Sequence, residues 1–174
     1  MALCPIDATM KYFAYGSNMC TRRLRERVPS AVVLFVARLN GYRFIFHKRS
    51  QDGSAKADAF ETVNPTDVVW GVVFKIDGRE KSNLDKAEGL GKGYKQKQVD
   101  VIGVTGRGTS VFTYVAEPES VDPRLTPYSW YKRFVLEGAS QHGLPEDYIA
   151  MIAGMQDKDD PDRARDEKKR AIKC

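Results

Sequence analysis

One short stretch near the start of the chain, residues 12–18 (Tyr-Phe-Ala-Tyr-Gly-Ser-Asn), constrains the fold more than any other part of the sequence. We expect a β-strand over Lys11–Tyr15 to end at Gly16, because glycine allows a positive φ or a close backbone approach. Ser17 or Asn18 is suited to cap a helix that follows. Unpaired N–H groups at a helix start attract carboxylates, phosphates or a developing oxyanion. The stretch therefore predicts a strand–turn–helix junction, either an anion and carbonyl site or a plain corner without a ligand.

Length and composition indicate one globular domain. With 174 residues, of which 42% are hydrophobic and 29% charged, the chain can bury a substantial core. No apolar run reaches the ~20 residues of a membrane span, so we expect no membrane association. The first residues, 1–7, have neither a basic segment nor an apolar run, which gives no support to a signal peptide. We expect a cytoplasmic protein.

The formal net charge of +5 raises the question of nucleic-acid binding. Four arginines at positions 22, 23, 25 and 27 lie on one predicted helix. Cys20, Leu24 and Val28 form an i, i+4, i+8 apolar stripe on that helix, so we interpret the arginines as its solvated face. Since no zinc-finger, RRM-like or basic–aromatic pattern accompanies them, we expect no nucleic-acid partner.

Cysteine and histidine spacing predicts neither a disulfide framework nor a metal site. The three cysteines at positions 4, 20 and 174 are far apart, and no C-x-x-C occurs. The two histidines, His47 and His142, form no H-x-x-x-H pattern. We expect reduced thiols, no cofactor, and an activity that survives prolonged chelation.

Patterning along the chain predicts about six strands. The apolar runs Ser30–Leu39 and Tyr42–Phe46, separated by Asn40-Gly41, suggest a β-hairpin. Asp67–Ile76 is almost continuously apolar, which is typical of a strand buried on both faces. Further strands are expected over Ala57–Val63, Tyr94–Val104 and Thr109–Ala116.

Helices are expected in three further places: over Glu80–Ala87 with Gly89 as its C-terminal cap, from Pro127 to Gly143, and from Pro145 onward. Strands with helices near the start, middle and end predict an α+β fold, a small mixed β-barrel flanked by helices. We assign residues 1–156 to this domain. Residues 157–174 are mostly charged, so we expect a flexible tail, disordered or loosely helical, whose deletion leaves the fold and the turnover largely intact.

The chain offers no convincing protein nucleophile or nucleotide fingerprint. Cys20 belongs to the apolar stripe of its helix, which favours a core cysteine. Ser17 lacks the G-x-S-x-G elbow, which favours a cap or a substrate contact. Residues 89–93 are glycine-rich but follow a helix and precede none, unlike a phosphate-binding loop.

A single carboxylate remains as a candidate base. Glu88 ends its predicted helix, where the negative end of the helix dipole disfavours an anion, and Leu84 and Leu90 lie nearby. A carboxyl group in such a position can act as a general base near neutral pH. A solvent-exposed glutamate beside Lys86 is the alternative.

The stretch 12–18, followed by an Arg-bearing helix, resembles the signature of the gamma-glutamylcyclotransferase family. Leu84-Asp85-x-x-Glu88-Gly89 followed by Gly93-Tyr94 is similar to the second motif of that family, whose Glu is the catalytic acid/base. The segment Tyr131-Lys132-Arg133 is similar to a third. The resemblance implies a closed β-barrel with a pocket at one end. It implies Glu88 as catalytic residue and a substrate-binding set of Tyr12, Phe13, Ala14, Tyr15, Gly16, Ser17, Asn18, Tyr94, Tyr114 and Tyr131.

The reaction implied by the resemblance converts gamma-glutamyl amino acids into 5-oxoproline and a free amino acid. The α-amine of the gamma-glutamyl group attacks its own side-chain amide, so that neither a protein nucleophile nor a metal is required. Three alternatives remain: action on glutathione, action on gamma-glutamylamines, and a non-catalytic binding role. The expected partner is a small gamma-glutamyl compound, and a homodimer is expected as well.

Overall fold

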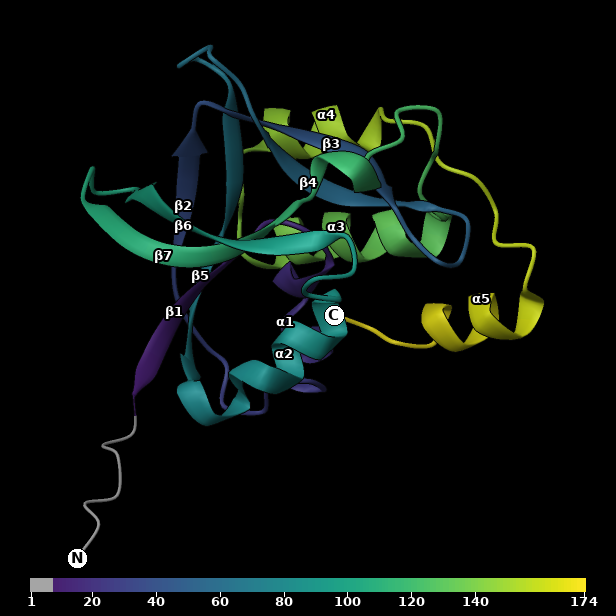
Figure 1. Ribbon diagram of the computed structural model, residues 1–174, viewed down its shortest axis with the longest axis horizontal. Coiled ribbons are helices and arrows are strands. Elements are labelled where there is room, and N and C mark those ends of the chain that lie inside the picture. Colours follow the sequence, from purple (N-terminus) through teal and green to yellow (C-terminus); the bar gives the residue numbers. More distant parts are fainter. Residues whose placement is uncertain (1–7) are drawn as a thin grey trace, which may run out of the picture.

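The computed structural model describes residues 8–174 and is built around a closed five-stranded barrel (Figure 1). The order of strands around it is β1-β5-β2-β6-β7. The strands are β1 (Thr9–Ala14), β2 (Val32–Asn40), β5 (Val68–Asp77), β6 (Tyr94–Gly103) and β7 (Gly108–Ala116). β5 pairs with β1 on one side and with β2 on the other, which explains its nearly continuous apolar sequence.

The barrel closes where β1 meets β7. The two strands run parallel and pair at Tyr12 and Phe112, whereas the other neighbours in the barrel are antiparallel. The Thr113 hydroxyl donates to the carbonyl oxygen of Phe13 at 2.8 Å across this seam. This mixed barrel with flanking helices confirms the predicted α+β fold, and its closure brings Tyr12 beside Tyr114.

The predicted hairpin across Asn40-Gly41 is wrong. Asn40 ends β2 and pairs with Val68 of the barrel, whereas the next strand, β3 (Tyr42–Arg49), pairs with β4 (Ala55–Glu61) in a separate two-stranded sheet. Gly41 alone separates the strands, with φ of 78°, and its N–H donates to Asp67 O. The glycine therefore directs the chain out of the barrel instead of turning it back on itself.

Five α-helices surround the sheets in the described part of the chain. They are α1 (Thr21–Arg25), α2 (Lys81–Glu88), α3 (Ser129–Gln141), α4 (Glu146–Ala153) and α5 (Arg163–Arg170). Short 3-10 turns η1 (Ser17–Met19), η2 (Gly78–Glu80) and η3 (Pro118–Ser120) connect some of them. α3 packs closely on η1: a Cβ on Gly138 would lie 2.5 Å from the backbone nitrogen of Cys20. α3 therefore packs directly against the predicted strand–turn–helix junction and supports it.

The chain after Gln156 differs from the flexible tail that the sequence predicts. It packs along α3 and forms α5 (Figure 1). The indole nitrogen of Trp130 donates to Asp160 at 2.8 Å, and Arg165 pairs with the same carboxylate. Arg133 donates to the carbonyl oxygens of Lys169 and Ile172. Ile172 and Cys174 pack against the core as well, but most of the contacts are hydrogen bonds and ion pairs, which hydrophobic patterning does not reveal.

The expectation of reduced cysteines also needs correction. Cys20 and Cys174 form a disulfide bond between residues 154 positions apart. Cys20 is fully buried, as the apolar stripe with Leu24 and Val28 predicts. Spacing along the sequence could not indicate the bond, because the docked tail brings the two cysteines together. Cys4 lies outside the described residues.

Candidate functional site

A small pocket opens at the end of the barrel where β1 stops. Its volume is about 290 Å³ when the space open to solvent is included. We call it the inner pocket, and its lining residues are Tyr12, Tyr15, Gly16, Ser17, Asn18, Ala57, Glu88, Tyr94, Tyr114 and Tyr131. Nine of these ten come from the set that the family resemblance implies, and Ala57 of β4 is the addition.

Glu88 is the one carboxylate that lines the inner pocket. It is the last residue of α2, and Gly89 ends the helix in the left-handed conformation with φ of 68°, as predicted. Asn18 Nδ2 donates to Glu88 Oε1 at 2.6 Å, and Arg27 lies 3.3 Å from the same oxygen. Glu88 Oε2 accepts no hydrogen bond within residues 8–174. One carboxylate oxygen is thus fixed in position, and the other is available to a ligand.

The loop between β1 and α1 forms one wall. Gly16 has φ of −108°, so it is the close approach that requires glycine: a Cβ there would lie 3.3 Å from Ala57 Cβ. The prediction that Ser17 or Asn18 caps a helix is wrong, because neither side chain accepts a bond from a helix N–H. Asn18 instead links Tyr12, Glu88 and Arg27, while Ser17 Oγ accepts from Arg23 Nε at 3.2 Å. Both polar side chains therefore form hydrogen bonds within the candidate site and do not cap a helix.

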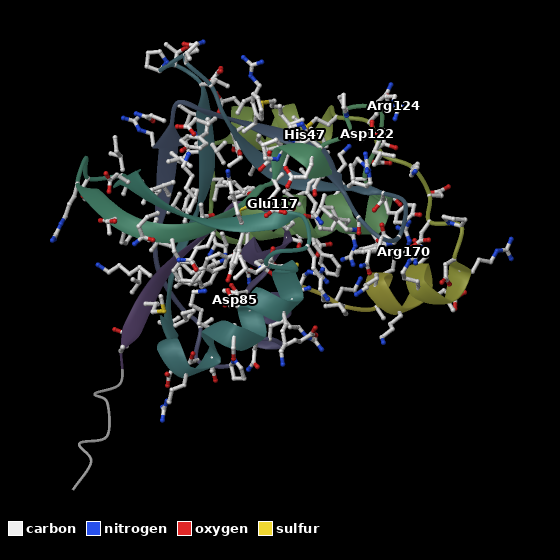
Figure 2. The ribbon with its side chains drawn as sticks, in the orientation of Figure 1. His47, Asp85, Glu117, Asp122, Arg124 and Arg170 are labelled. Carbon is white, nitrogen blue, oxygen red and sulfur yellow. A yellow bond between two sulfur atoms is a disulfide. The ribbon has the colours of Figure 1, made fainter. Side chains whose placement is uncertain are left out.

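Tyrosines form most of the remaining wall. Tyr94 donates to the carbonyl oxygen of Ala57, and Tyr131 accepts from the N–H of the same residue at 3.2 Å. Tyr15 donates to Tyr114 O, and Tyr114 donates to Asp85, which α2 presents to the barrel (Figure 2). These bonds connect β4, the barrel strands and helices α2 and α3 around one cavity.

The tyrosine hydroxyls stay protonated at neutral pH. Burial raises the pKa of Tyr12 well above its usual value, and the charge of Glu88 raises it further. Burial likewise raises the pKa of Tyr94 and of Tyr131. The phenols can therefore donate hydrogen bonds and shape the pocket, but they are poor candidates for the base.

Phe13 and Ala14 lie away from the inner pocket, although the resemblance implies that they bind substrate. Phe13 is fully buried, and its ring lies over Gly71, where a Cβ would come within 2.7 Å of it. Ala14 is buried as well and pairs with Val72 of β5. Both residues belong to the barrel wall, because they precede the point where the chain leaves the strand.

Interpreting the arginines of residues 22–27 as a solvated helix face misses a group of cationic residues near Glu88. Arg23 is only 7% exposed, and Arg27 is half-buried and contacts both Asn18 and Glu88. Arg23 and Arg27 are four residues apart, a spacing that places them on one face and could have indicated a shared role. Lys48 and Lys56, from the two strands of the β3–β4 sheet, complete the group.

Residues 8–174 contain neither a metal-binding cluster nor a membrane-spanning helix. No group of three or more His, Cys, Asp or Glu side chains is arranged to hold a metal ion there. Within the same range, no helix has the length and apolar character needed to cross a membrane.

The chain is similar to several known proteins. Residues 68–152 match the model of the AIG2-like family. The gamma-glutamylcyclotransferase of Bos taurus is 37% identical over 155 residues, which is 85% of this chain and 79% of the relative. The Homo sapiens gamma-glutamylcyclotransferase is 31% identical over 159 residues, 89% of this chain and 83% of the relative.

A solved structure described as a gamma-glutamyl cyclotransferase superimposes with a TM-score of 0.83 at 28% identity, covering 95% of this chain and 100% of that one. Sequence identity, coverage and fold point the same way. The chain belongs to the gamma-glutamylcyclotransferase family.

Proposed function

We propose that this protein is a gamma-glutamylcyclotransferase that converts gamma-L-glutamyl amino acids into 5-oxoproline and a free amino acid. The relatives that carry this name support the reaction. The observation that carries the proposal is Glu88, whose Oε1 is held by Asn18 and Arg27 while Oε2 is open to a ligand of the inner pocket.

The reaction needs one bond formed and one broken. The α-amino nitrogen of the gamma-glutamyl group attacks the side-chain carbonyl carbon, and the new C–N bond closes a five-membered lactam. The original amide C–N bond then breaks and releases the amino acid. The attacking nitrogen, an ammonium at the start, loses two protons to become the lactam N–H, and the leaving nitrogen gains two to become the ammonium of the released amino acid. Neither water nor a co-reactant is consumed.

Glu88 is assigned both proton transfers. Its Oε2 accepts a proton from the substrate ammonium and returns it to the leaving nitrogen, a role for which a carboxylate is suited when it lies within hydrogen-bond reach of both nitrogens. Asn18 and Arg27 keep the carboxylate in one orientation while Oε2 works. Arg27 also places a positive charge 3.3 Å from Glu88 Oε1, so the carboxylate interacts with this charge as well as with the helix dipole.

The pocket walls are assigned to binding and orientation. The backbone of Tyr15, Gly16 and Ser17 would hold the substrate carboxylate or the oxyanion that develops on the attacked carbonyl. The tyrosines would fold the gamma-glutamyl chain so that its amine lies against its own carbonyl, which removes most of the entropic barrier of ring closure. Phe13 and Ala14 would support the loop from within the barrel.

A direct assay tests this function. Purified protein is incubated with gamma-glutamyl-alanine, glutathione and gamma-glutamyl-lysine, and 5-oxoproline is measured by mass spectrometry. We expect release from gamma-glutamyl-alanine. Release from glutathione alone would assign the glutathione-directed reaction, and release from gamma-glutamyl-lysine alone would assign action on gamma-glutamylamines. Binding of these compounds without release would leave a binding module and refute the enzyme.

We also propose the setting in which this enzyme works: glutathione metabolism in the cytoplasm, as a homodimer. These points follow from the family resemblance and the expectations drawn from the sequence. Analytical ultracentrifugation tests the dimer, because a monomer at micromolar concentration would contradict it. Cell fractionation tests the compartment.

A further inference from the structure

A second hollow adjoins the inner pocket on the side of Glu88. Its empty volume is about 440 Å³, and we call it the outer pocket. Four residues line both hollows: Ser17, Glu88, Tyr94 and Tyr131. A ligand that fills the inner pocket and extends past Glu88 would therefore enter the outer one.

The outer pocket is distinguished by its positive charge. Four cationic side chains line it, namely Arg23, Arg27, Lys48 and Lys56, whereas Glu88 is the one carboxylate in the lining. Part of this charge is compensated. Arg27 lies 3.3 Å from Glu88, and Lys56 pairs with Asp52 at 2.9 Å.

Two of the cations have no carboxylate partner in the described part of the chain. Arg23 is 7% exposed, and its one hydrogen bond goes from Nε to Ser17 Oγ. Lys48 is 8% exposed, and its ammonium lies 4.7 Å from the centre of the Tyr94 ring. Burying a charge without a partner is costly. Two such cations in the wall of one hollow indicate that an anion belongs there.

The pKa shifts show that burial outweighs the nearby carboxylates. Burial lowers the pKa of Lys48 against the charges of Glu88, Asp52 and Glu117. Burial together with the charge of Arg27 lowers the pKa of Arg23 to about 10, against the charges of Glu88 and Glu26. Burial also lowers the pKa of Lys56 to about 8, against the effect of Asp52. Bringing an anion into the hollow would relieve this electrostatic strain.

The chemistry of the proposed function says which anion would reach the outer pocket. Glu88 must lie within hydrogen-bond reach of the leaving nitrogen in order to protonate it. In a gamma-glutamyl dipeptide, a single carbon atom separates that nitrogen from the carboxylate of the leaving amino acid. With the gamma-glutamyl part in the inner pocket, this carboxylate projects past Glu88 toward Arg23 and Lys48.

We propose that the outer pocket binds the carboxylate of the leaving amino acid and makes the enzyme selective for anionic leaving groups. This inference rests on the proposed function. Gamma-glutamyl dipeptides with a free carboxylate are preferred over gamma-glutamylamines and dipeptide amides, and acidic leaving amino acids are preferred over their neutral isosteres. Arg23 and Lys48 are the residues that determine this specificity.

Two substrate pairs of matched shape test the inference. One is gamma-glutamyl-alanine against gamma-glutamyl-alaninamide, and the other is gamma-glutamyl-glutamate against gamma-glutamyl-glutamine. Each pair is compared in wild type, Lys48→Met and Arg23→Gln. Lys75→Met, on the exposed face of β5, is the control for loss of a lysine outside the pocket. Calorimetric binding of the same four compounds accompanies the kcat/KM measurements.

For wild type we expect kcat/KM for gamma-glutamyl-alanine to exceed that for gamma-glutamyl-alaninamide by about tenfold to a hundredfold. This is the range for one hydrogen bond to a charged group. The ratio should shrink in Lys48→Met and Arg23→Gln, should stay unchanged in Lys75→Met, and should fall as salt screens the charges. Equal kcat/KM within both pairs would overturn the inference while leaving the cyclotransferase function intact. If no compound is turned over, the proposed function fails, and a lack of charge preference in the calorimetric affinities would then refute anion binding as well.

Discussion

The inner and outer pockets share Glu88 but are built in opposite ways. In the inner pocket, the phenol hydroxyls of Tyr15, Tyr94 and Tyr114 each donate to a partner within the protein. In the outer pocket, Arg23 and Lys48 have no carboxylate partner among residues 8–174. A satisfied network fixes the shape of a pocket, whereas buried cations that form no ion pair can pair with an anionic ligand. The contrast separates the proposed chemistry, on the inner side of Glu88, from the proposed selectivity, on its outer side.

Replacing the base should have the largest effect on turnover, because the proposed chemistry depends on Glu88. Glu88→Gln keeps the shape of the side chain but removes its capacity to accept the ammonium proton. Because one group serves both transfers, we expect kcat to fall by about 10²–10⁴-fold or more, with substrate binding retained. The rate of 5-oxoproline formation and calorimetry measure the two quantities.

The matched control is Glu146→Gln, an exposed glutamate in the first turn of α4. It should turn over like wild type. Similar rates for Glu88→Gln and wild type would show that Glu88 is not the base. In Glu146→Gln the preference for anionic leaving groups should persist, because Glu146 lines neither pocket.

Displacing the loop between β1 and α1, which forms one wall of the inner pocket, should have the next largest effect on turnover. In Gly138→Ala the new methyl group would lie 2.5 Å from the backbone nitrogen of Cys20, so α3 would push the loop at Ser17 and Asn18. Since a displacement of about 1 Å can cost on the order of 10²-fold in rate, we expect turnover to drop by about tenfold to a hundredfold. Steady-state kinetics on gamma-glutamyl-alanine measures it.

Gly154→Ala at the end of α4 is the control, because its nearest neighbour would be 3.6 Å away. It should behave like wild type. Full activity in Gly138→Ala would mean that the loop tolerates displacement and that its backbone does not orient the substrate.

Raising the pH should affect the outer pocket and not the tyrosines. Lys56, with its pKa of about 8, is protonated below that pH and neutral above it. Asp52, Arg23 and Lys169 face it, together with the rings of Tyr128, Trp130 and Tyr131. We therefore expect the alanine-over-alaninamide ratio of kcat/KM to fall a few-fold between pH 7 and about pH 9.5. Titration of the substrate ammonium cancels in this ratio, since both compounds share the gamma-glutamyl group. A ratio that rises with pH would contradict the assignment.

Opening the disulfide should have the smallest effect on turnover, because neither pocket includes a residue of the tail. In Cys174→Ser we expect kcat/KM within about twofold of wild type. The free energy of unfolding should fall by about 3–5 kcal/mol, which lowers Tm by on the order of 10 °C for a chain of this size. Calorimetry with and without reductant measures it, and reductant should shift Tm of wild type only. Loss of turnover at unchanged Tm would mean that the tail supports a pocket.

Local patterns predicted much of the barrel, and the family resemblance implied most of the residues that line the inner pocket. The apolar run Asp67–Ile76 became the central strand β5, and Gly89 ends α2 in the conformation expected of it. The stretch 12–18 brings a strand to a close glycine contact at the edge of the inner pocket. Such features depend on neighbours in sequence, so pattern and propensity indicate them.

What could not be predicted depends on partners far apart in the chain. Asn40-Gly41 has the sequence of a hairpin turn, yet β2 pairs with β5 and β6, whereas β3 pairs with β4. Arg23 and Arg27 look solvated on their own helix, but α2, with Glu88, and the β3–β4 sheet, with Lys48, cover that face. The tail docks through Trp130–Asp160 and Arg133, contacts that no periodicity records. Tertiary context overrides local patterning in each case.

The disulfide gives the molecule an unusual covalent topology. Because Cys20 is joined to Cys174, residues 20–174 form one closed ring, with the first strand attached to it as a branch. A protease that cuts once at any exposed loop of the ring leaves a single covalent species, whose fragments separate only after reduction. The branch point also directly follows the Ser17–Met19 turn, so the disulfide holds Cys174 beside the proposed substrate loop, from which it is far apart in sequence.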